Sequence, residues 1–567
     1  MLRRFNLILV YMACVVSWTA TPAWAQLSRI KKPKLIVTLV VDQFRADQVA
    51  RFQNRFLPPV GPQGEPGGFR YLTERGAYYP LAEFGLLQNM TCPGHATILS
   101  GAYAYQHGIS GNIWYDASIQ KPMYCVEDSG YPQVGVADPG SQRGVSPKNF
   151  RGTTLGDELK NSGYGSRVVT LALKDRAAVL LGGSRADLAL WFDRESQNWV
   201  SSRYYLPEGK LPTWVQDVNA AFHKNHKATL SWNRPEGQGT GTSWTDNSFV
   251  EKSKATEAMG RDFPHQLSGR NTYASYFPES TTWTVDTAIA ALQALKLGRG
   301  PDTDLLGVSF STHDNLSHSF GPNSRQVEEL TIIEDKEIAR FLKAIKQTVG
   351  LENTIIVLTG DHGGMPNAEW LHAHKLDAGR VDEDKLMEEG ENFLAKTFGS
   401  VKGGNWIAYQ ANFNFYLNPE ALKQYSKLNK EDVANRLARF YREEGSIRNG
   451  ILHVFSAADV RLNTLPPGMF QKQIQNTFTA GRSGDVVMIL KPNYVMPGST
   501  AEHMSGYSYD RMVPLALVGP QIKAGVYGQK AEIIDIAPTL AFFAGTLPPT
   551  GSEGRVLHEI LRNEIKP

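Results

Sequence analysis

The sequence has few cysteines, no strong excess of charge and no repeats. Only three of its 567 residues are cysteine, which excludes a fold held together by a disulfide framework. Lys and Arg total 59 against 56 Asp and Glu, a formal net charge of +3 without a polybasic run, so we expect neither nucleic acid nor a membrane surface as a partner. We find no internal repeat and no low-complexity linker. Hydrophobic residues make up 41%, ample for the core of one large domain.

The N-terminal residues are typical of a secretory signal peptide. Basic Arg3 and Arg4 precede an apolar run, and a small-x-small site ends at Ala25. The apolar run is interrupted by Ser17 and is shorter than the roughly 20 residues of a membrane-spanning helix. We therefore expect residues 1–25 to be removed and the mature chain, from Gln26, to be periplasmic or secreted.

Removal of that segment leaves two cysteines, Cys92 and Cys125. One bridge between them is chemically possible outside the cytoplasm, and two unpaired thiols are equally compatible with the sequence. The same cleavage removes two arginines and no acidic residue, which lowers the net charge from +3 to about +1.

Short runs rich in Val, Ile and Leu recur along the chain and alternate with helical patterns. Continuous apolar runs indicate strands buried on both faces of a parallel sheet. Apolar spacings of three and four predict helices over 283–296 and 325–348. The alternation predicts an α/β fold, a three-layer α/β/α sandwich with a mostly parallel central sheet. The predicted strands lie near 34–42, 166–174, 304–314, 353–362 and 512–520.

Two long segments, about 190–282 and 365–480, lack this alternation of apolar runs and helical patterns. The first is rich in Trp, Tyr, Asn and Ser, and the second has a charged run followed by a helical pattern. We interpret both as insertions in a catalytic domain that spans 26–567.

Acidic residues and histidines follow several predicted strands, where ligands gather in sheets of this kind. Asp314 and His318 have the spacing of one helical face, and Asp361-His362 lies between glycines at a strand end. Each pair alone is also compatible with a capping Asp beside a solvated His. With Asp42 and His503 they provide three Asp and three His, a set that suits two zinc ions better than calcium or magnesium.

Thr91 precedes Pro93 and Gly94 in a pattern typical of the start of a helix. In isolation it is more simply interpreted as a helix cap. Beside metal ligands it becomes a candidate nucleophile, because a cation lowers the pKa of a hydroxyl without a dedicated base.

These motifs, in this order, resemble the alkaline phosphatase superfamily over nearly the whole mature chain. The motifs are Asp42 after a strand, Asn-x-Thr-x-Pro-x-His at 89–95, His-Gly-Ile-x-Gly-Asn ending at Asn112, Asp314 with His318, Gly-Asp-His-Gly-Gly at 360–364, and the late His503. The resemblance implies two zinc ions, one bound by Asp314, His318 and His503 and the other by Asp42, Asp361 and His362 with the Thr91 oxygen. It also implies a phosphothreonine intermediate at Thr91. Met504 departs from the usual His-Gly-Ser order.

The surroundings of the transferred group separate the activities within this superfamily. Sulfatases need a Cys-x-Pro-x-Arg motif, which is absent because Cys92 is displaced by one position and no arginine follows. Lys174 and Arg176 resemble the Lys-x-Arg pair of threonine-nucleophile bacterial alkaline phosphatases, and Asn112 is expected to bind a phosphoryl oxygen. The extra cations favour a monoesterase of broad substrate range. A nucleotide pyrophosphatase or phosphodiesterase is the alternative, and a non-catalytic zinc-binding module a more distant one.

The expected partners follow from this function. They are small-molecule phosphate esters, without nucleic acid or membrane, and we expect a monomer with a homodimer as the alternative. His95, His107 and His313 are interpreted as structural supports.

Overall fold

The computed structural model describes residues 31–562 except 138–142, 164, 226–228, 234–235, 237–246, 270, 444–449 and 469. The expected signal peptide, residues 1–25, lies outside the described residues. Among the helices that are described, none is both long enough and apolar enough to cross a bilayer.

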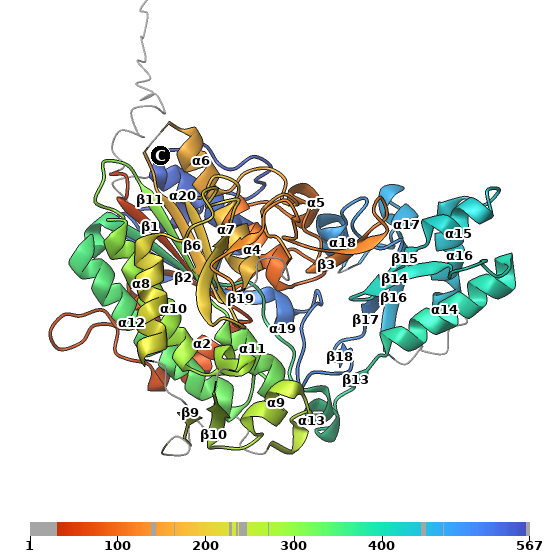
Figure 1. Cartoon of the computed structure of the whole chain (residues 1–567), viewed down its shortest axis with the longest axis horizontal. Coiled ribbons are helices and arrows are strands. Elements are labelled where there is room, and N and C mark those ends of the chain that lie inside the picture. The colour runs from red at the N-terminus through yellow and green to blue at the C-terminus, as the bar shows by residue number, and fades with distance from the viewer. Residues whose placement is uncertain are drawn as a thin grey trace, which may run out of the picture.

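A ten-stranded sheet runs through the centre of the described structure, in the order β20-β2-β19-β12-β1-β11-β6-β7-β8-β5 (Figure 1). Five neighbours in its middle are parallel. Outside them each strand is antiparallel to its inner neighbour, except the edge strand β20, which is parallel to β2. The parallel strands are β12 (Thr354–Gly360), β1 (Leu35–Val41), β11 (Asp304–Phe310), β6 (Val168–Ala172) and β7 (Leu188–Asp193). The flanking strands are β19 (Met512–Val518), β2 (Ala77–Glu83), β20 (Gly525–Val526), β8 (Asn198–Ser202) and β5 (Gln133–Val134).

All five strands predicted from apolar runs are present, and they are neighbours, β19-β12-β1-β11-β6. The direction of β19 differs from the expected parallel arrangement, because it pairs antiparallel with both β12 and β2. An apolar run indicates that a strand is buried on both faces and carries no information on its direction.

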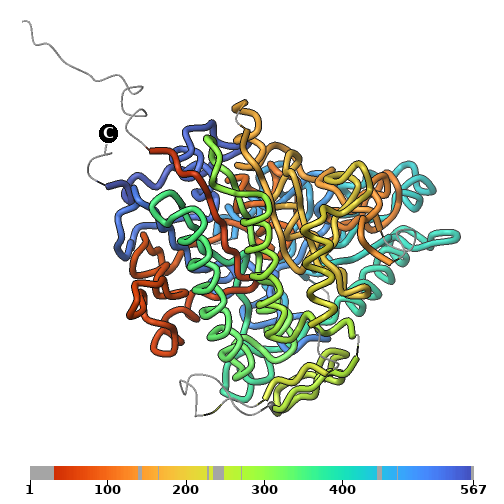
Figure 2. The backbone as a smooth tube through the Cα atoms, turned by 60° about the vertical axis from the view of Figure 1, so that its left-hand side comes forward, coloured from red at the N-terminus to blue at the C-terminus, as the bar shows by residue number. Residues whose placement is uncertain are grey.

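Helices cover both faces of the sheet, which confirms the predicted three-layer sandwich. Alternate residues of β1 point to opposite faces. Val37 and Leu39 pack in one core with helices α10 (Glu279–Ala294) and α12 (Arg325–Thr348), which run alongside the red strand β1 in Figure 2. Ile36 and Val40 pack in a second core with α4 (Thr91–Ser100), α6 (Leu155–Asn161) and α20 (Ile536–Ala544).

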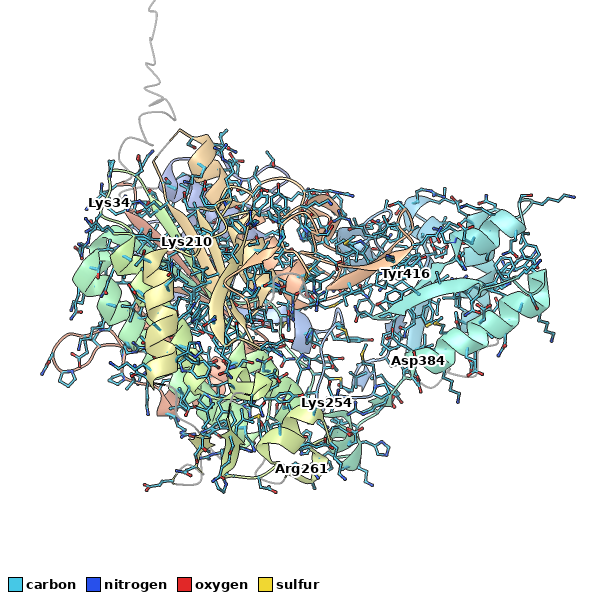
Figure 3. All side chains as sticks on the ribbon, in the orientation of Figure 1. Lys34, Lys210, Lys254, Arg261, Asp384 and Tyr416 are labelled. Carbon is cyan, nitrogen blue, oxygen red and sulfur yellow. A yellow bond between two sulfur atoms is a disulfide. The ribbon has the colours of Figure 1, made fainter. Side chains whose placement is uncertain are left out.

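The segment from about 365 onward builds a smaller body beside the main sheet (Figure 1). Its four-stranded sheet has the order β14 (Ile407–Ala411), β15 (Asn414–Leu417), β17 (Val486–Leu490), β16 (Ile451–Ser456). Helices α14 (Glu383–Phe398) and α16 (Lys430–Glu443) share its separate apolar core. Tyr416, labelled in Figure 3, packs against Tyr115 of β3 (Ile113–Asp116) and so joins this body to the main one.

The segment of about 190–282 has mixed roles. Its first residues belong to β7 and β8 of the main sheet, and α8 (Thr213–Asn225), β9 (Thr229–Trp232) and β10 (His265–Ser268) follow. The limits of the two insertions stay predictions.

Candidate active site

Four parallel strands end at one edge of the sheet and bring charged side chains together there. Asp42 follows β1 directly, and Asp361 follows β12. Asp314 lies in the first turn of α11 (Thr312–Phe320), just beyond β11, and Lys174 lies two residues beyond β6. Because β12, β1, β11 and β6 are adjacent and parallel, these four residues converge.

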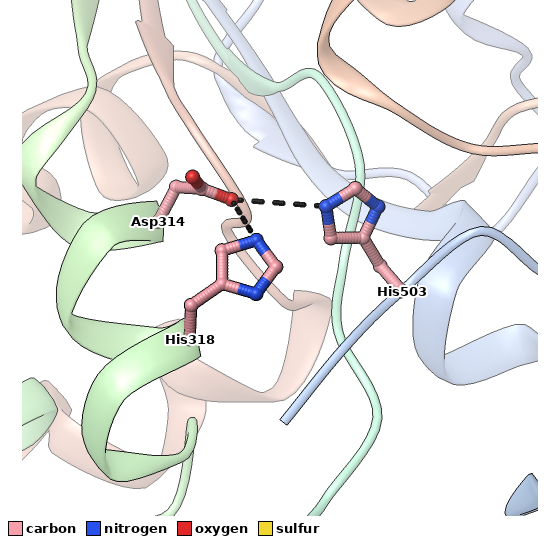
Figure 4. Close-up of side chains that lie close together, drawn as sticks. All are labelled: Asp314, His318 and His503. Atoms are coloured by element: carbon pink, nitrogen blue, oxygen red, sulfur yellow. Dashed lines mark ion pairs between the residues drawn. The ribbon is translucent and has the colours of Figure 1, made fainter. Parts of the chain in front are cut away.

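Asp314, His318 and His503 form a first group of possible metal ligands (Figure 4). The Nε2 atoms of His318 and His503 lie 3.2 Å and 3.8 Å from Asp314 Oδ1. His318 follows Asp314 by one helical turn, whereas His503 approaches from a distant part of the chain. The structure thus brings together all three residues expected to hold one cation.

Asp42, Asp361 and His362, expected to hold the other cation, also lie together. His362 Nε2 is 3.5 Å from Asp42 Oδ1 and 3.5 Å from Asp361 Oδ2. Ligand atoms of Asp42, His362 and Asp314 all lie within 4.8 Å of one another. Asp314 therefore adjoins both groups, a sharing that the sequence did not indicate.

The three imidazoles present the same nitrogen, Nε2, to the aspartates of the two groups. A carbonyl oxygen only accepts hydrogen bonds, so each Nδ1 must carry a proton, and in the neutral form of each ring the Nε2 lone pair is then the one that can bind a cation. The Nδ1 distances are 2.9 Å to Ala501 O for His318, 2.8 Å to Gly363 O for His362 and 2.7 Å to Asn89 O for His503.

One ammonium group lies between two of these carboxylates. Lys174 Nζ lies 2.6 Å from Asp42 Oδ2 and 2.6 Å from Asp314 Oδ2. Burial raises the pKa of Asp42 well above its usual value, and the charges of Asp314 and Asp361 raise it further. Burial, the main cause, and neighbouring rings lower the pKa of His503, so it is neutral at pH 7.

Several atoms of the two groups are buried and make no hydrogen bond within the described structure. They are Asp42 Oδ1 and Oδ2, Asp314 Oδ1, Asp361 Oδ2 and His362 Nε2. Buried polar atoms normally have partners, and a cation would supply one here. The donor set of carboxylates and imidazoles therefore fits divalent metal ions, and this mixture suits zinc.

Thr91 is the first residue of helix α4 and is 1% exposed. Its Oγ1 lies 3.4 Å from Lys174 Nζ. His95, expected to be structural, contacts the Thr91 carbonyl at 2.9 Å and Asp361 Oδ2 at 3.1 Å. The hydroxyl thus faces a cation at a helix N-terminus, where the backbone favours an anion.

Asn112 is oriented by the start of the same helix. Its Oδ1 accepts a hydrogen bond of 2.9 Å from the Cys92 amide, so its Nδ2 is available as a donor. A disulfide joins Cys92 to Cys125, which decides between the two states that the sequence left open. Cys125 N also donates to the carbonyl of Asn112 at 3.0 Å.

Arg176 lies in the first turn of α7 (Asp175–Gly182). Its Nη1 donates to the hydroxyl of Tyr124 at 3.3 Å, and that hydroxyl donates to Asp175 Oδ1 at 2.5 Å. Neither Tyr124 nor Asp175 is among the site residues predicted from the sequence. Asp175 is adjacent to Lys174 and Arg176 and so could have been considered, but Tyr124 is 51 residues away and no local pattern links it to them.

Comparisons with known proteins show the family and the fold of the chain. A family model described as type I phosphodiesterase / nucleotide pyrophosphatase matches residues 36–508. The chain belongs to this family. Alkaline phosphatase PhoV of Synechococcus elongatus is 31% identical over 94% of this chain and 94% of its own length. Alkaline phosphatase PafA of Elizabethkingia meningoseptica is 31% identical over 94% and 95%.

A crystal structure of wild-type alkaline phosphatase PafA has a TM-score of 0.83 and 29% identity, and it covers 94% of this chain and 100% of PafA. The resemblance to the alkaline phosphatase superfamily is confirmed, and with it the expectation of a hydrolase on the phosphodiesterase-like branch.

Proposed function

We propose that the protein is a zinc-dependent alkaline phosphatase that hydrolyses a broad range of phosphate monoesters through a phosphothreonine at Thr91. The observation that carries this proposal is the position of Lys174, whose Nζ lies 3.4 Å from the Thr91 hydroxyl, with Arg176 following on the same turn. A monoester carries about two negative charges on its free oxygens, and a second cation favours it over a diester. The alkaline phosphatases among the relatives support the same choice.

Each side chain of the site has its own role in the proposed reaction. Thr91 Oγ1 loses its proton to solvent and forms a bond to phosphorus, while the bond from phosphorus to the leaving oxygen breaks and that oxygen takes up a proton from water. Lys174, Arg176 and the Asn112 amide bind the free oxygens, where negative charge is held in the transition state. His95 fixes the Thr91 backbone and Asp361 together, so the nucleophile keeps its orientation. Water then cleaves the phosphothreonine, which releases phosphate and restores the hydroxyl.

Two zinc ions, the cofactor that we propose, would be held by Asp314, His318 and His503 and by Asp42, Asp361, His362 and Thr91. When bound, zinc supplies Lewis acidity, which lowers the pKa of a hydroxyl and offsets charge on the phosphoryl group.

The second candidate is a nucleotide pyrophosphatase or phosphodiesterase, favoured by the description of the family model. The ratio of kcat/KM for an aryl phosphate to that for its methyl diester separates the two candidates, and we expect the monoester to be preferred. A strong preference for the diester would refute the first proposal.

Substitution of Thr91 by Ala should abolish turnover and phosphate labelling of the protein. Arg176→Ala should lower monoester kcat/KM by roughly 10- to 100-fold, the value of a charged hydrogen bond, and diester hydrolysis far less. Lys210 is an exposed lysine of the main body (Figure 3), and Lys210→Ala is the matched control for the loss of a cation. It should change neither monoester nor diester hydrolysis.

We further propose a periplasmic or secreted monomer, with a homodimer as the alternative. The disulfide between Cys92 and Cys125 supports an oxidising compartment. Light scattering on the purified protein tests the oligomeric state, and fractionation of the source cells tests the location.

A further inference from the structure

The hydroxyl of Tyr124 lies between the carboxylate of Asp175 and the guanidinium of Arg176. It is 2.5 Å from Asp175 Oδ1 and 3.3 Å from Arg176 Nη1. Burial raises the pKa of Tyr124, so the hydroxyl keeps its proton at neutral pH. That proton is donated to Asp175, and an oxygen lone pair accepts the bond from Arg176.

Asp175 is the nearest competitor for the charge of Arg176. The two residues are neighbours in the chain, and Asp175 Oδ1 already accepts the Arg176 backbone N–H at 2.7 Å. A guanidinium next to a carboxylate normally forms a direct ion pair. Here Asp175 Oδ1 instead accepts a hydrogen bond from the Tyr124 hydroxyl. Arg176 Nε is buried and has no hydrogen-bond partner within the described structure, so it remains available to an oxygen of a ligand.

Tyr124 is itself fixed to the nucleophile. It ends strand β4 (Lys121–Tyr124), and the next residue, Cys125, is bonded to Cys92, which follows Thr91. Strand β4 pairs antiparallel with β3, which starts directly after Asn112. The hydroxyl therefore has a defined position relative to both Thr91 and Asn112.

We propose that Tyr124 is a positioning residue that separates Arg176 from Asp175 and so keeps the guanidinium directed at the phosphoryl group. Arg176 binds oxygens of that group, and Tyr124 never contacts them. The inference rests on the proposed function, since it requires that Arg176 binds a phosphoryl group.

Inorganic phosphate is the probe, as a competitive inhibitor of whichever ester the full-length enzyme hydrolyses fastest. Tyr124→Phe should weaken phosphate inhibition roughly tenfold, because Arg176 turns to Asp175 and a charged hydrogen bond to phosphate is lost. Tyr115→Phe makes the same change in the adjacent strand β3, where the ring packs on Tyr409 and Tyr416, and should leave the inhibition constant unchanged.

Two double variants separate positioning from general structural damage. Adding Asp175→Asn to Tyr124→Phe removes the competing carboxylate and should restore phosphate inhibition to within about threefold of the wild type. Adding Tyr124→Phe to Arg176→Ala should cause no further loss, because the residue being positioned is absent. Failure of the rescue, or additive losses, would overturn the proposal.

If Tyr124→Phe does not fold, the single variant Asp175→Asn still tests the idea. Its amide oxygen can accept the tyrosine proton, and without the carboxylate charge phosphate should bind at least as tightly as to the wild type. A tenfold loss would contradict the proposed separation. The monoester-to-diester ratio of the wild type tests the proposed function independently. An unchanged inhibition constant for Arg176→Ala would refute this inference even if that ratio favours monoesters.

Discussion

Reduction of the disulfide between Cys92 and Cys125 should destabilise the protein by a calculable amount. The bridge closes a loop with a sequence separation of 33. Loop closure removes conformational entropy from the unfolded chain, and for a loop of this length the expected effect is about 4 kcal/mol at 25 °C. Both cysteines are fully buried, so reduction leaves two thiols in the same apolar surroundings and changes packing little.

The assay is equilibrium unfolding in urea, with and without a reductant, after refolding has shown that the transition is reversible. The reduced protein should unfold at a lower urea concentration, and the difference in free energy of unfolding should be about 4 kcal/mol. A variant with both cysteines replaced by alanine is the control. It lacks the bridge in every condition, so the reductant should not shift its transition.

Equal midpoints for oxidised and reduced wild type would refute the reasoning, because the loop constraint would then contribute nothing. An equal shift of the alanine variant would show that the reductant acts elsewhere, for example by removing metal. Monitoring ester hydrolysis below the transition adds a second readout, since the bridge adjoins both Thr91 and the Asn112 contact at Cys92.

Three further predictions concern the surroundings of His503 and the metal site. Burial raises the pKa of Asp510 from 3.8 to about 7. Between these pH values the folded protein keeps the proton that the unfolded chain loses, so the contribution of Asp510 to the free energy of unfolding is full below about pH 4 and is lost as pH rises to 7. Asp510→Asn should remove this loss, which is on the order of 4 kcal/mol in urea unfolding between these pH values. Met504 has a φ of 98°, which favours glycine, so Met504→Gly should raise the free energy of unfolding by up to about 1 kcal/mol; a decrease would contradict the strain. Complete chelation should abolish ester hydrolysis and lower the melting temperature, because the buried carboxylates then repel one another, and zinc should restore both; full activity after chelation would exclude the metal role.

Much of the central fold could be predicted from the sequence because the signals are local. A strand buried on both faces needs an unbroken apolar run, and this identified β1, β6, β11, β12 and β19. The helical period over 325–348 coincides with α12. The direction of β19 and the separate four-stranded sheet could not be predicted, because they depend on pairing between residues far apart in the chain.

The candidate site, too, could be predicted from the sequence only in part. Strand ends made the convergence of Asp42, Asp314 and Asp361 predictable, since parallel neighbours end at one edge. The position of Asp314 between both ligand groups depends on side-chain orientation, which spacing does not specify. Tyr124 reaches the site from a hairpin held by the disulfide, and no periodic signal marks such a residue.

We expect Lys174 to link the charge of the ligand groups to the binding of phosphate. Its ammonium contacts Asp42 and Asp314 at 2.6 Å each and reaches Thr91 Oγ1 at 3.4 Å. While both carboxylates are otherwise uncompensated, they attract the ammonium strongly in this buried position. Neutralisation of Asp42 and Asp314 by other positive charge weakens that attraction, and the ammonium can then bind an anionic oxygen near Thr91. Cations at the strand edge and phosphate at the helix N-terminus should therefore bind cooperatively, and this coupling should weaken in Lys174→Ala.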